Sequence, residues 1–465
     1  MKIYNSLSRQ KEDFVSINED LVKMYVCGPT VYDHAHIGHG RVAVVFDVIR
    51  KYLEYKGYKV LFASNYTDID DKMINKAKEM QISVTSLADM MIKEYENDMK
   101  LLKVKEPTYK PFATEYIETM IEMVQALLSH DIAYVLDDGI YFDLKKYPDY
   151  GKLTCQNLED LKPESRVKVA EGKRNSGDFV LWKFEKPDEP SWEAPFGKGR
   201  PGWHIECSAM VKKIFDGATI DIHGGGEDLK FPHHDCEIAQ SEAFDNKTYV
   251  KYWMHNAFVM VDSQKMSKSL GNFSTLKDTF KEFEPEIVRF YYLQNKYRDP
   301  MDFHADALIQ AKNTLAKIHN FYFDLSDYTS FNGKLNSDVE YEVNTMIENF
   351  EKNMDDDFNT VHFLADFYDF IKYVNKKIRL EDLSNIDVEY IKSNLRKIDK
   401  VLCFIIPPKK KLDLQIDIEK LIEERDNARN QKNFQLADQI RDDLLNKYSI
   451  QLIDKPGEKT TWRMI

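Results

Sequence analysis

Two short motifs in this chain combine residue types that act on phosphate groups. The first, His-Ile-Gly-His, spans residues 36–39, and the second, Lys-Met-Ser-Lys-Ser, spans residues 265–269. Imidazole and ammonium groups donate hydrogen bonds or positive charge to phosphoryl oxygens when negative charge develops in a transition state. Together, in this order, the two motifs indicate a site that activates the α-phosphate of ATP.

The first motif places two histidines on one face of a predicted helix. His36 and His39 are three residues apart, so both side chains can reach one phosphate. Gly38 between them lets the backbone approach the ligand closely. An isolated pair of histidines with this spacing caps or packs a helix about as often as it binds a ligand. Because the pair follows a predicted strand, we interpret both histidines as catalytic and ATP-binding.

The second motif supplies two ammonium groups on a Ser- and Gly-rich loop. Lys265 and Lys268 are predicted to be catalytic, with Lys268 also binding ATP, by closing over a triphosphate and departing with pyrophosphate. A Lys-x-x-Lys pair alone is usually a solvated loop. The complete pentapeptide after an apolar stretch, downstream of the histidine motif, favours the phosphate interpretation.

A third constellation has the residue types of a zinc site. Cys27 ends the first predicted strand, Cys207 lies far along the chain, and His233 and Glu237 are four residues apart on one helical face. Two thiolates, an imidazole and a carboxylate suit tetrahedral zinc. Only the His233–Glu237 spacing is informative by itself, and unpaired buried cysteines are common, so a structural role stays open. Two neighbouring potential ligands point to other faces and are predicted to be supporting or structural residues: His234 and Cys236.

The elements around these residues follow a strand–helix–strand pattern. Residues 23–28 are predicted to form a buried strand, residues 38–56 a helix with a regular apolar stripe, and residues 58–63 the next strand. This order predicts a parallel sheet, in which phosphates bind at the carboxyl ends of the strands beside helix N-termini. A glycine run at residues 224–226, before Asp228, suits the close approach of a nucleotide.

The remaining chain alternates helical and strand-like segments. We expect, in chain order, helices over residues 72–130, loops and short strands that interrupt the sheet over 147–201, further strands near 219–222 and 253–261, amphipathic helices over 306–404, a linker at 407–411, one charged helix over 416–447, and an extended end that reaches Trp462.

Composition excludes several classes of protein. The chain has 465 residues, 43% of them hydrophobic, with 27 Phe and 26 Tyr, which predicts roughly three folded domains and excludes global disorder. No apolar run is long enough to span a membrane, and the start has no signal-peptide pattern. Five cysteines make no disulfide framework, which favours the cytoplasm. A net charge of −13 argues against indiscriminate polyanion binding but permits a local RNA-binding face.

These motifs resemble those of the class I aminoacyl-tRNA synthetases, specifically the cysteinyl-tRNA synthetase family. The matching blocks in the catalytic half lie at residues 25–33, 36–39, 65–72, 173–183, 199–208, 221–226, 231–234 and 265–269. The C-terminal third matches more loosely, at residues 355–360, 437–442 and 462–463. The family usually has Glu-Asn after the paired histidines, whereas this chain has Asp235 and Cys236, a thiol that could perturb the metal.

The resemblance implies an α/β fold: a Rossmann-type parallel-sheet catalytic domain with an inserted connective subdomain, then an all-α helical bundle and a small C-terminal domain. The implied divisions are residues 1–100 and 206–262 for the two halves of the catalytic domain, 101–205 for the insertion, 263–310 for the KMSKS loop and stem-contact region, 311–405 for the anticodon-side bundle, and 406–465 for the anticodon-binding domain.

The resemblance also implies the reaction: ATP-dependent ligation of L-cysteine to tRNA(Cys) through cysteinyl-adenylate, with Mg²⁺ on ATP. One zinc ion per chain, binding the substrate thiolate for selectivity, would be held by Cys27, Cys207, His233 and Glu237. Residues around the amino-acid part of the adenylate would be Gly28, Thr67, Trp203 and His223, and Asp228 would contact the adenosine. The implied protein is a monomer without an editing domain. Trp462 is equally suited to stacking on an RNA base or to packing the tail.

Two alternatives differ in the acceptor and in activity. A ligase that joins cysteine to an amino sugar shares the catalytic half, but the long region after Asp306 argues against it. A catalytically silent RNA- or metal-binding relative is disfavoured by the intact histidines, lysines and metal-type residues. Cysteine-dependent ATP–pyrophosphate exchange and cysteine attachment to tRNA separate the three possibilities.

Overall fold

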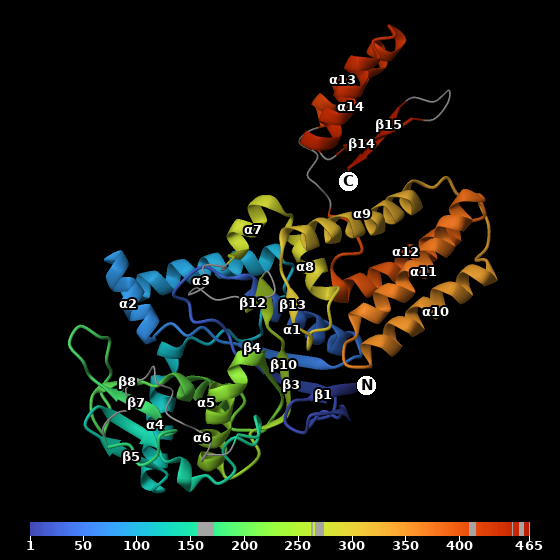
Figure 1. The fold of residues 1–465 in the computed structure, drawn as a ribbon. Coiled ribbons are helices and arrows are strands. Elements are labelled where there is room, and N and C mark those ends of the chain that lie inside the picture. Colours follow the sequence, from blue (N-terminus) through green and yellow to red (C-terminus); the bar gives the residue numbers. More distant parts are fainter. Residues whose placement is uncertain are drawn as a thin grey trace. The chain divides into compact units, whose positions relative to one another are not determined.

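The computed structural model describes residues 1–156, 172–261, 264–265, 274–408, 415–448, 450–454 and 460–464 (Figure 1). These residues form two compact units. The first comprises Met1–Leu308 with Glu351–Leu364, and the second comprises Ile309–Phe350 with Ala365–Ile465. Among the described residues, none of the helices is long and apolar enough to cross a membrane.

A four-stranded, fully parallel sheet lies at the centre of the first unit. Its strand order places β3, the first of its strands in sequence, between β4 and β9, so the order reverses beside β3. A ligand crevice is expected outside the carboxyl ends of strands at such a reversal. Across the sheet the strands are β10 (Val250–Asn256), β9 (Ile220–Gly226), β3 (Leu21–Val26) and β4 (Lys59–Ser64).

Helix α1 (Ile37–Tyr55) connects β3 to β4 and confirms the predicted strand–helix–strand unit. Its apolar stripe, including Phe46 and Ile49, is buried. Phe46 packs so closely on β9 that a Cβ placed on Gly224 would lie 2.3 Å from the Phe46 ring. Gly224 is therefore required for helix–sheet packing, a role that its place in the glycine run does not reveal.

The insertion between β4 and β9 contains helices and an antiparallel sheet. Strands β7 and β8 fall within the region predicted as loops and short strands, and β5 and β6 precede it. The helices are α2 (Asp71–Met80), α3 (Val84–Leu101), α4 (Ile117–Ser129) and α5 (Trp203–Ile214). The strands, in sheet order, are β5 (Ala133–Leu136), β6 (Gly139–Phe142), β7 (Phe179–Phe184) and β8 (Gly199–Pro201).

After the central sheet the first unit adds a small three-stranded sheet. Strand β11 pairs antiparallel with β12 and parallel with β13, and β12 carries Lys265. The bounds are α6 (Asp235–Asp245), β11 (Val259–Val261), β12 (Gln264–Lys265), α7 (Leu276–Glu282), α8 (Pro285–Leu293) and β13 (Met301–Asp302). The N-terminal hairpin is β1 (Lys2–Asn5) with β2 (Gln10–Asp13).

Long amphipathic helices dominate the rest of the chain, as predicted. In the second unit, Phe321 of α9 lies edge-on to Phe367 of α11, with ring centroids 6.4 Å apart. The four helices are α9 (Ala305–Asp327), α10 (Ser337–Met354), α11 (Thr360–Arg379) and α12 (Asn385–Leu402).

The prediction of one charged helix over residues 416–447 is wrong. Two helices, α13 (Gln415–Asn430) and α14 (Phe434–Tyr448), occupy this stretch. Lys432 turns the chain with a φ of 60°, and Asn433 Oδ1 then accepts a hydrogen bond from Leu436 N–H (3.3 Å). The turn brings together a separate core, to which Trp462 packs, and its buried members are Ile422, Ile440, Leu444 and Ile450. Trp462 lies on strand β15 (Thr461–Met464), which pairs with β14 (Ile450–Ile453).

Candidate active site and metal centre

A cavity of about 830 Å³ opens in the first unit beside the carboxyl ends of β3 and β4. Most of the predicted site residues contribute to its wall, although they come from distant parts of the sequence. The ones that line it are Cys27, Gly28, His36, His39, Thr67, Trp203, Cys207, Asp228 and His233. His223 and Glu237 are fully buried behind this wall.

His36 and His39 form the N-terminal cap of α1 with their own side chains. The His39 N–H donates to His36 Nδ1 (3.3 Å), and the His36 N–H donates to His39 Nδ1 (3.4 Å). The two rings stack with centroids 3.6 Å apart. Because both Nδ1 atoms accept, each neutral ring carries its proton on Nε2. The motif thus presents both imidazoles in the donor form that phosphate oxygens require.

The second phosphate motif is described only at its first residue. The backbone of Lys265 lies in β12, where Lys265 is the register partner of Met260 in β11. Lys268, the other predicted catalytic lysine, lies outside the described residues.

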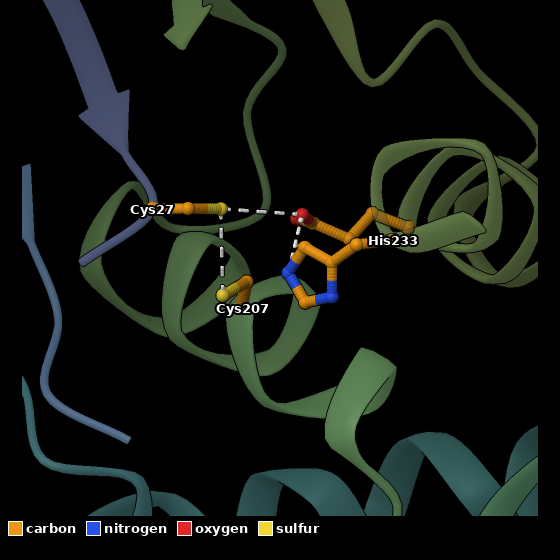
Figure 2. A group of neighbouring side chains, drawn as sticks. Cys27, Cys207 and His233 are labelled. Carbon is orange, nitrogen blue, oxygen red and sulfur yellow. Dashed lines mark hydrogen bonds and ion pairs between the residues drawn. The ribbon is translucent and has the colours of Figure 1, made fainter. Parts of the chain in front are cut away.

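The four predicted metal ligands converge on one point, and Figure 2 shows three of them, Cys27, Cys207 and His233, facing one another. Cys27 directly follows β3, Cys207 lies in α5, His233 lies in the helical turn Lys230–His234, and Glu237 lies in the first turn of α6. Cys27 Sγ lies 3.7 Å from Cys207 Sγ and 3.4 Å from Glu237 Oε1. His233 Nε2 lies 3.1 Å from Glu237 Oε1, and all four ligand atoms fall within 4.8 Å of one another. In a tetrahedral zinc site with bonds of about 2.0–2.3 Å, ligand atoms are about 3.3–3.8 Å apart. The donor set and its spacing therefore fit zinc.

The electrostatics of this group also fit a cation. Burial would raise the pKa of Glu237, but His223 and His233 lower it well below its usual range. The hydrogen bond from Cys27 lowers the pKa of Cys207 to about 6, whereas burial and the contact with Cys207 raise that of Cys27. Two thiolates this close ionise together only beside a positive charge, which a divalent metal supplies.

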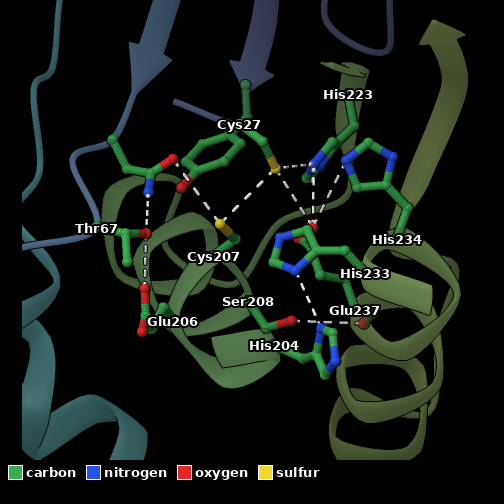
Figure 3. A network of polar contacts seen from close by, with 12 residues as sticks. Cys27, Thr67, His204, Glu206, Cys207, Ser208, His223, His233, His234 and Glu237 are labelled. Atoms are coloured by element: carbon green, nitrogen blue, oxygen red, sulfur yellow. Dashed lines mark hydrogen bonds and ion pairs between the residues drawn. The ribbon is translucent and has the colours of Figure 1, made fainter. Parts of the chain in front are cut away.

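Residues around the group orient its ligands (Figure 3). Tyr249 donates to Glu237 Oε2 (3.1 Å), and His204 Nδ1 lies 3.0 Å from His233 Nδ1. Such partners fix which atom of a ligand faces the metal, and here they leave Glu237 Oε1 and His233 Nε2 for it. The sequence reasoning gave neither Tyr249 nor His204 a role, because neither has an informative spacing to the ligands it contacts.

A second set of potential ligands overlaps the first. Cys27 and Glu237 also lie within 4.8 Å of nitrogen atoms of His223 and His234. The prediction that His234 points to another face is therefore wrong: its Nε2 lies 3.9 Å from Glu237 Oε1. His223 Nε2 is 3.4 Å from Cys27 Sγ. His234 Nδ1 is 2.8 Å from His255 Nε2, a histidine that had no predicted role. His223 thus contacts the ligand Cys27 rather than lining the cavity.

Cys236, the thiol that departs from the family pattern, faces away from the group. Its Sγ lies 3.5 Å from the hydroxyl of Tyr150, and it is not among the clustered ligand atoms. The helical geometry that predicted a different face for Cys236 is confirmed.

Gly28 and Thr67 are held by polar residues that the sequence reasoning did not single out. A Cβ on Gly28 would lie 1.7 Å from the backbone oxygen of Asn65, so only glycine fits there. Asn65 Oδ1 accepts from Gly28 N–H (2.8 Å), and Thr67 Oγ1 contacts Glu206 Oε2 (2.8 Å). Burial, followed by the nearby Cys207, raises the pKa of Glu206 well above its usual range.

Comparison with known families identifies the class of protein. The family described as "tRNA synthetases class I (C) catalytic domain" matches residues 13–313, which is more than half of the chain, and a DALR domain matches residues 349–406. The chain therefore belongs to the class I aminoacyl-tRNA synthetases, and it is an aminoacyl-tRNA ligase with the predicted α/β catalytic domain and helical C-terminal region.

Solved structures with a similar fold are also aminoacyl-tRNA synthetases. Mycobacterium tuberculosis methionyl-tRNA synthetase in complex with methionyl-adenylate matches with a TM-score of 0.60 and 13% identity, over 83% of this chain and 89% of that one. The LeuRS of Agrobacterium radiobacter K84, in a ternary complex with tRNA and LeuAMS, has a TM-score of 0.62 and 10% identity, over 83% and 84%. A putative arginyl tRNA synthetase from Campylobacter jejuni has a TM-score of 0.54 and 13% identity, over 84% and 94%.

Proposed function

We propose that this synthetase is a cysteine–tRNA ligase. It forms cysteinyl-adenylate and pyrophosphate from L-cysteine and ATP, and then transfers the cysteinyl group to the terminal adenosine of tRNA(Cys). One observation carries the proposal: the thiols of Cys27 and Cys207 and the imidazole of His233 border the same cavity as the phosphate-motif residues His36 and His39.

Zinc would be held by Cys27 Sγ, Cys207 Sγ, His233 Nε2 and Glu237 Oε1. When bound, zinc supplies a soft Lewis acid for which the thiolate of cysteine is a strong ligand. The serine hydroxyl is poorly acidic, and alanine and valine have no ligand atom. This difference exceeds the roughly 1–3 kcal/mol that an apolar pocket gains from one methylene, so no editing domain is required.

The residues of the two phosphate motifs and of the cavity wall have the remaining proposed roles. His36 and His39 donate through Nε2–H to the phosphate, and Lys265 and Lys268 neutralise the departing pyrophosphate, with Mg²⁺ accompanying ATP. Asp228 contacts the adenosine. Gly28, Thr67 and Trp203 of the cavity wall would contact the amino-acid part of the adenylate, and His223, buried behind this wall, would support them through its contact with Cys27.

The helical regions serve the second substrate. We propose that the bundle over residues 311–405 lies on the anticodon side, that the small domain over residues 406–465 binds the anticodon loop, and that residues 101–205 are the connective insertion. The DALR match at residues 349–406 supports a tRNA-directed role for the bundle. The enzyme would act as a monomer in the cytoplasm.

Amino-acid-dependent ATP–pyrophosphate exchange tests the specificity. We expect exchange with cysteine and rates at least ~100-fold lower with serine, alanine, valine and methionine, because only cysteine offers a thiolate. Attachment of labelled cysteine to tRNA then distinguishes this enzyme from a ligase with an amino-sugar acceptor. Exchange with another amino acid at a rate near that of cysteine would refute the proposed specificity.

A further inference from the structure

The start of α1 is bonded to residues 274–276, which begin five positions after the last residue of the KMSKS motif. Ile37 N–H donates to Ser274 O (3.3 Å), and Leu276 N–H donates to Ala35 O (2.8 Å). Residues 274–276 are thereby fixed by backbone hydrogen bonds to the turn that carries the first histidine motif.

The chain before the KMSKS segment is bonded to the same helix through one side chain. Arg41, two residues after His39 in the sequence, is fully buried. Its Nη1 donates to Ala257 O and Phe258 O, both at 3.0 Å. Its Nη2 donates to Lys296 O (3.1 Å) and Asp299 O (2.7 Å).

These four carbonyls lie just before the first residues of β11 and β13, the strands that form one sheet with the Lys265-bearing strand β12. Phe258 directly precedes β11, and Asp299 lies two residues before β13. Strand β11 pairs with β13 on one side and with β12, which carries Lys265, on the other. A shift of the residues that precede either strand would therefore move β12, the strand that carries this lysine.

The hydrogen bonds of the Arg41 guanidinium suit it to holding two chain segments in a fixed position. Within the described residues, no carboxylate forms an ion pair with Arg41, and the donors on its two terminal nitrogens go to backbone oxygens of two separate chain segments. The rigid planar guanidinium can bridge two segments in a fixed geometry, which a lysine ammonium cannot reproduce. A buried charge without an ionic partner is expensive as a source of stability alone.

We propose that Arg41 is a positioning residue that holds the Lys265-bearing sheet in register with His36 and His39, so that both motifs meet the same phosphate chain. The inference rests on the catalytic role proposed for Lys265, and it does not depend on which amino acid is activated. Helix α1 would then both present the two histidines and position the sheet that carries Lys265.

A double-mutant cycle tests this role. We would measure kcat and KM by ATP–pyrophosphate exchange for the wild type, Arg41→Lys, Lys265→Ala and the double variant, using the amino acid that best supports exchange. Because a misplacement of about 1 Å can cost ~100-fold in rate, we expect Arg41→Lys to lower kcat by roughly 10- to 100-fold. The KM for the amino acid should stay within about twofold, because the metal group does not contact Arg41.

The cycle also separates positioning from simple destabilisation. If Arg41 acts through Lys265, Arg41→Lys should lower kcat by less than about twofold once Lys265 is already alanine. Additive losses, or an unchanged kcat in Arg41→Lys, would overturn the proposal. If that variant fails to fold by circular dichroism, Tyr291→Phe replaces it, because the Tyr291 hydroxyl donates to Asp302 O of β13 (2.5 Å) and fastens the same sheet. An unchanged kcat in Tyr291→Phe would then overturn it.

Failure of the proposed specificity gives a different result. If cysteine supports no exchange in the wild type while another amino acid does, the cysteine assignment is refuted, and the cycle is still measured with that other amino acid. If cysteine supports exchange but the cycle is additive, the specificity stands and the role of Arg41 is refuted.

Discussion

Cys27 illustrates how one residue joins fold and chemistry. It directly follows β3, and its N–H donates to Gly224 O (3.0 Å), which extends the pairing of β3 with β9 beyond the last strand residue. Its side chain is thereby directed toward Cys207 and Glu237. The position of this thiol is set by sheet pairing, whereas that of Cys207 is set by the first turns of α5.

Replacing one cysteine at a time distinguishes a metal ligand from a cysteine that does not bind the metal. We expect Cys207→Ser to lose most of the zinc, because a serine hydroxyl is a far poorer zinc ligand than a thiolate. Cys236→Ser is a matched control in the neighbouring helix, and it should keep about one zinc per chain because Cys236 faces Tyr150. Metal analysis of the purified variants measures both. Equal zinc in the two variants would exclude the proposed ligand set.

At the scale of elements, α1 and β9 are packed unusually close at the wall of the cavity. The Phe46 ring occupies the space where any other residue at position 224 would place its Cβ. This approach brings the histidine cap of α1 and the glycine end of β9 to the same cavity, where Asp228 also lies. The close helix–sheet packing at the wall of the cavity thus depends on one glycine.

A larger side chain at position 224 should lower the stability of the protein, and a smaller side chain at position 46 should restore part of it. Gly224→Ala is expected to lower the free energy of unfolding by about 1–3 kcal/mol, because the methyl group collides with the Phe46 ring. Phe46→Leu alone should destabilise through lost packing, but in the Gly224→Ala background it should restore part of the loss. Urea denaturation of the four proteins provides the measurement. Strictly additive changes would show that the two residues do not share the contact.

At the scale of the whole molecule, the cavity and the C-terminal helices belong to different units. Every residue that lines the cavity falls between Val26 and Val259, inside the first unit. The C-terminal helices α13 and α14 have a small core of their own, with Leu444 fully buried and its neighbour Leu445 exposed. Amino-acid activation and recognition of tRNA should therefore respond separately to substitutions.

A pair of adjacent leucines tests that separation in the full-length chain. Leu444→Asp places a carboxylate in the small core and should disrupt it. We expect ATP–pyrophosphate exchange within about twofold of the wild type, but cysteine attachment to tRNA at least ~10-fold slower, because ordered contacts to RNA are lost. Leu445→Asp, on the exposed side of the same helix, should match the wild type in both assays. Loss of exchange in Leu444→Asp would contradict the separation.

Several features follow from the sequence because they depend on local order. The apolar period of residues 38–56 and the flanking apolar runs determine α1, β3 and β4, since helix and strand periodicity are properties of neighbouring residues. The spacing of His233 and Glu237 likewise places both on one side of a helical turn. The break between α13 and α14 could not be predicted in this way, because the composition of residues 416–447 does not reveal that Lys432 adopts a left-handed conformation and ends α13.

Only the tertiary structure determines which distant residues meet. Cys27 and Cys207 are brought within 3.7 Å by sheet order and helix packing, and no spacing in the sequence encodes that distance. The same holds for Arg41, an ordinary residue on an apolar helix, whose four carbonyl partners lie more than 200 positions away. The residue types therefore set which chemistry is available, and the long-range packing, which depends on contacts between segments far apart in the chain, sets where that chemistry takes place.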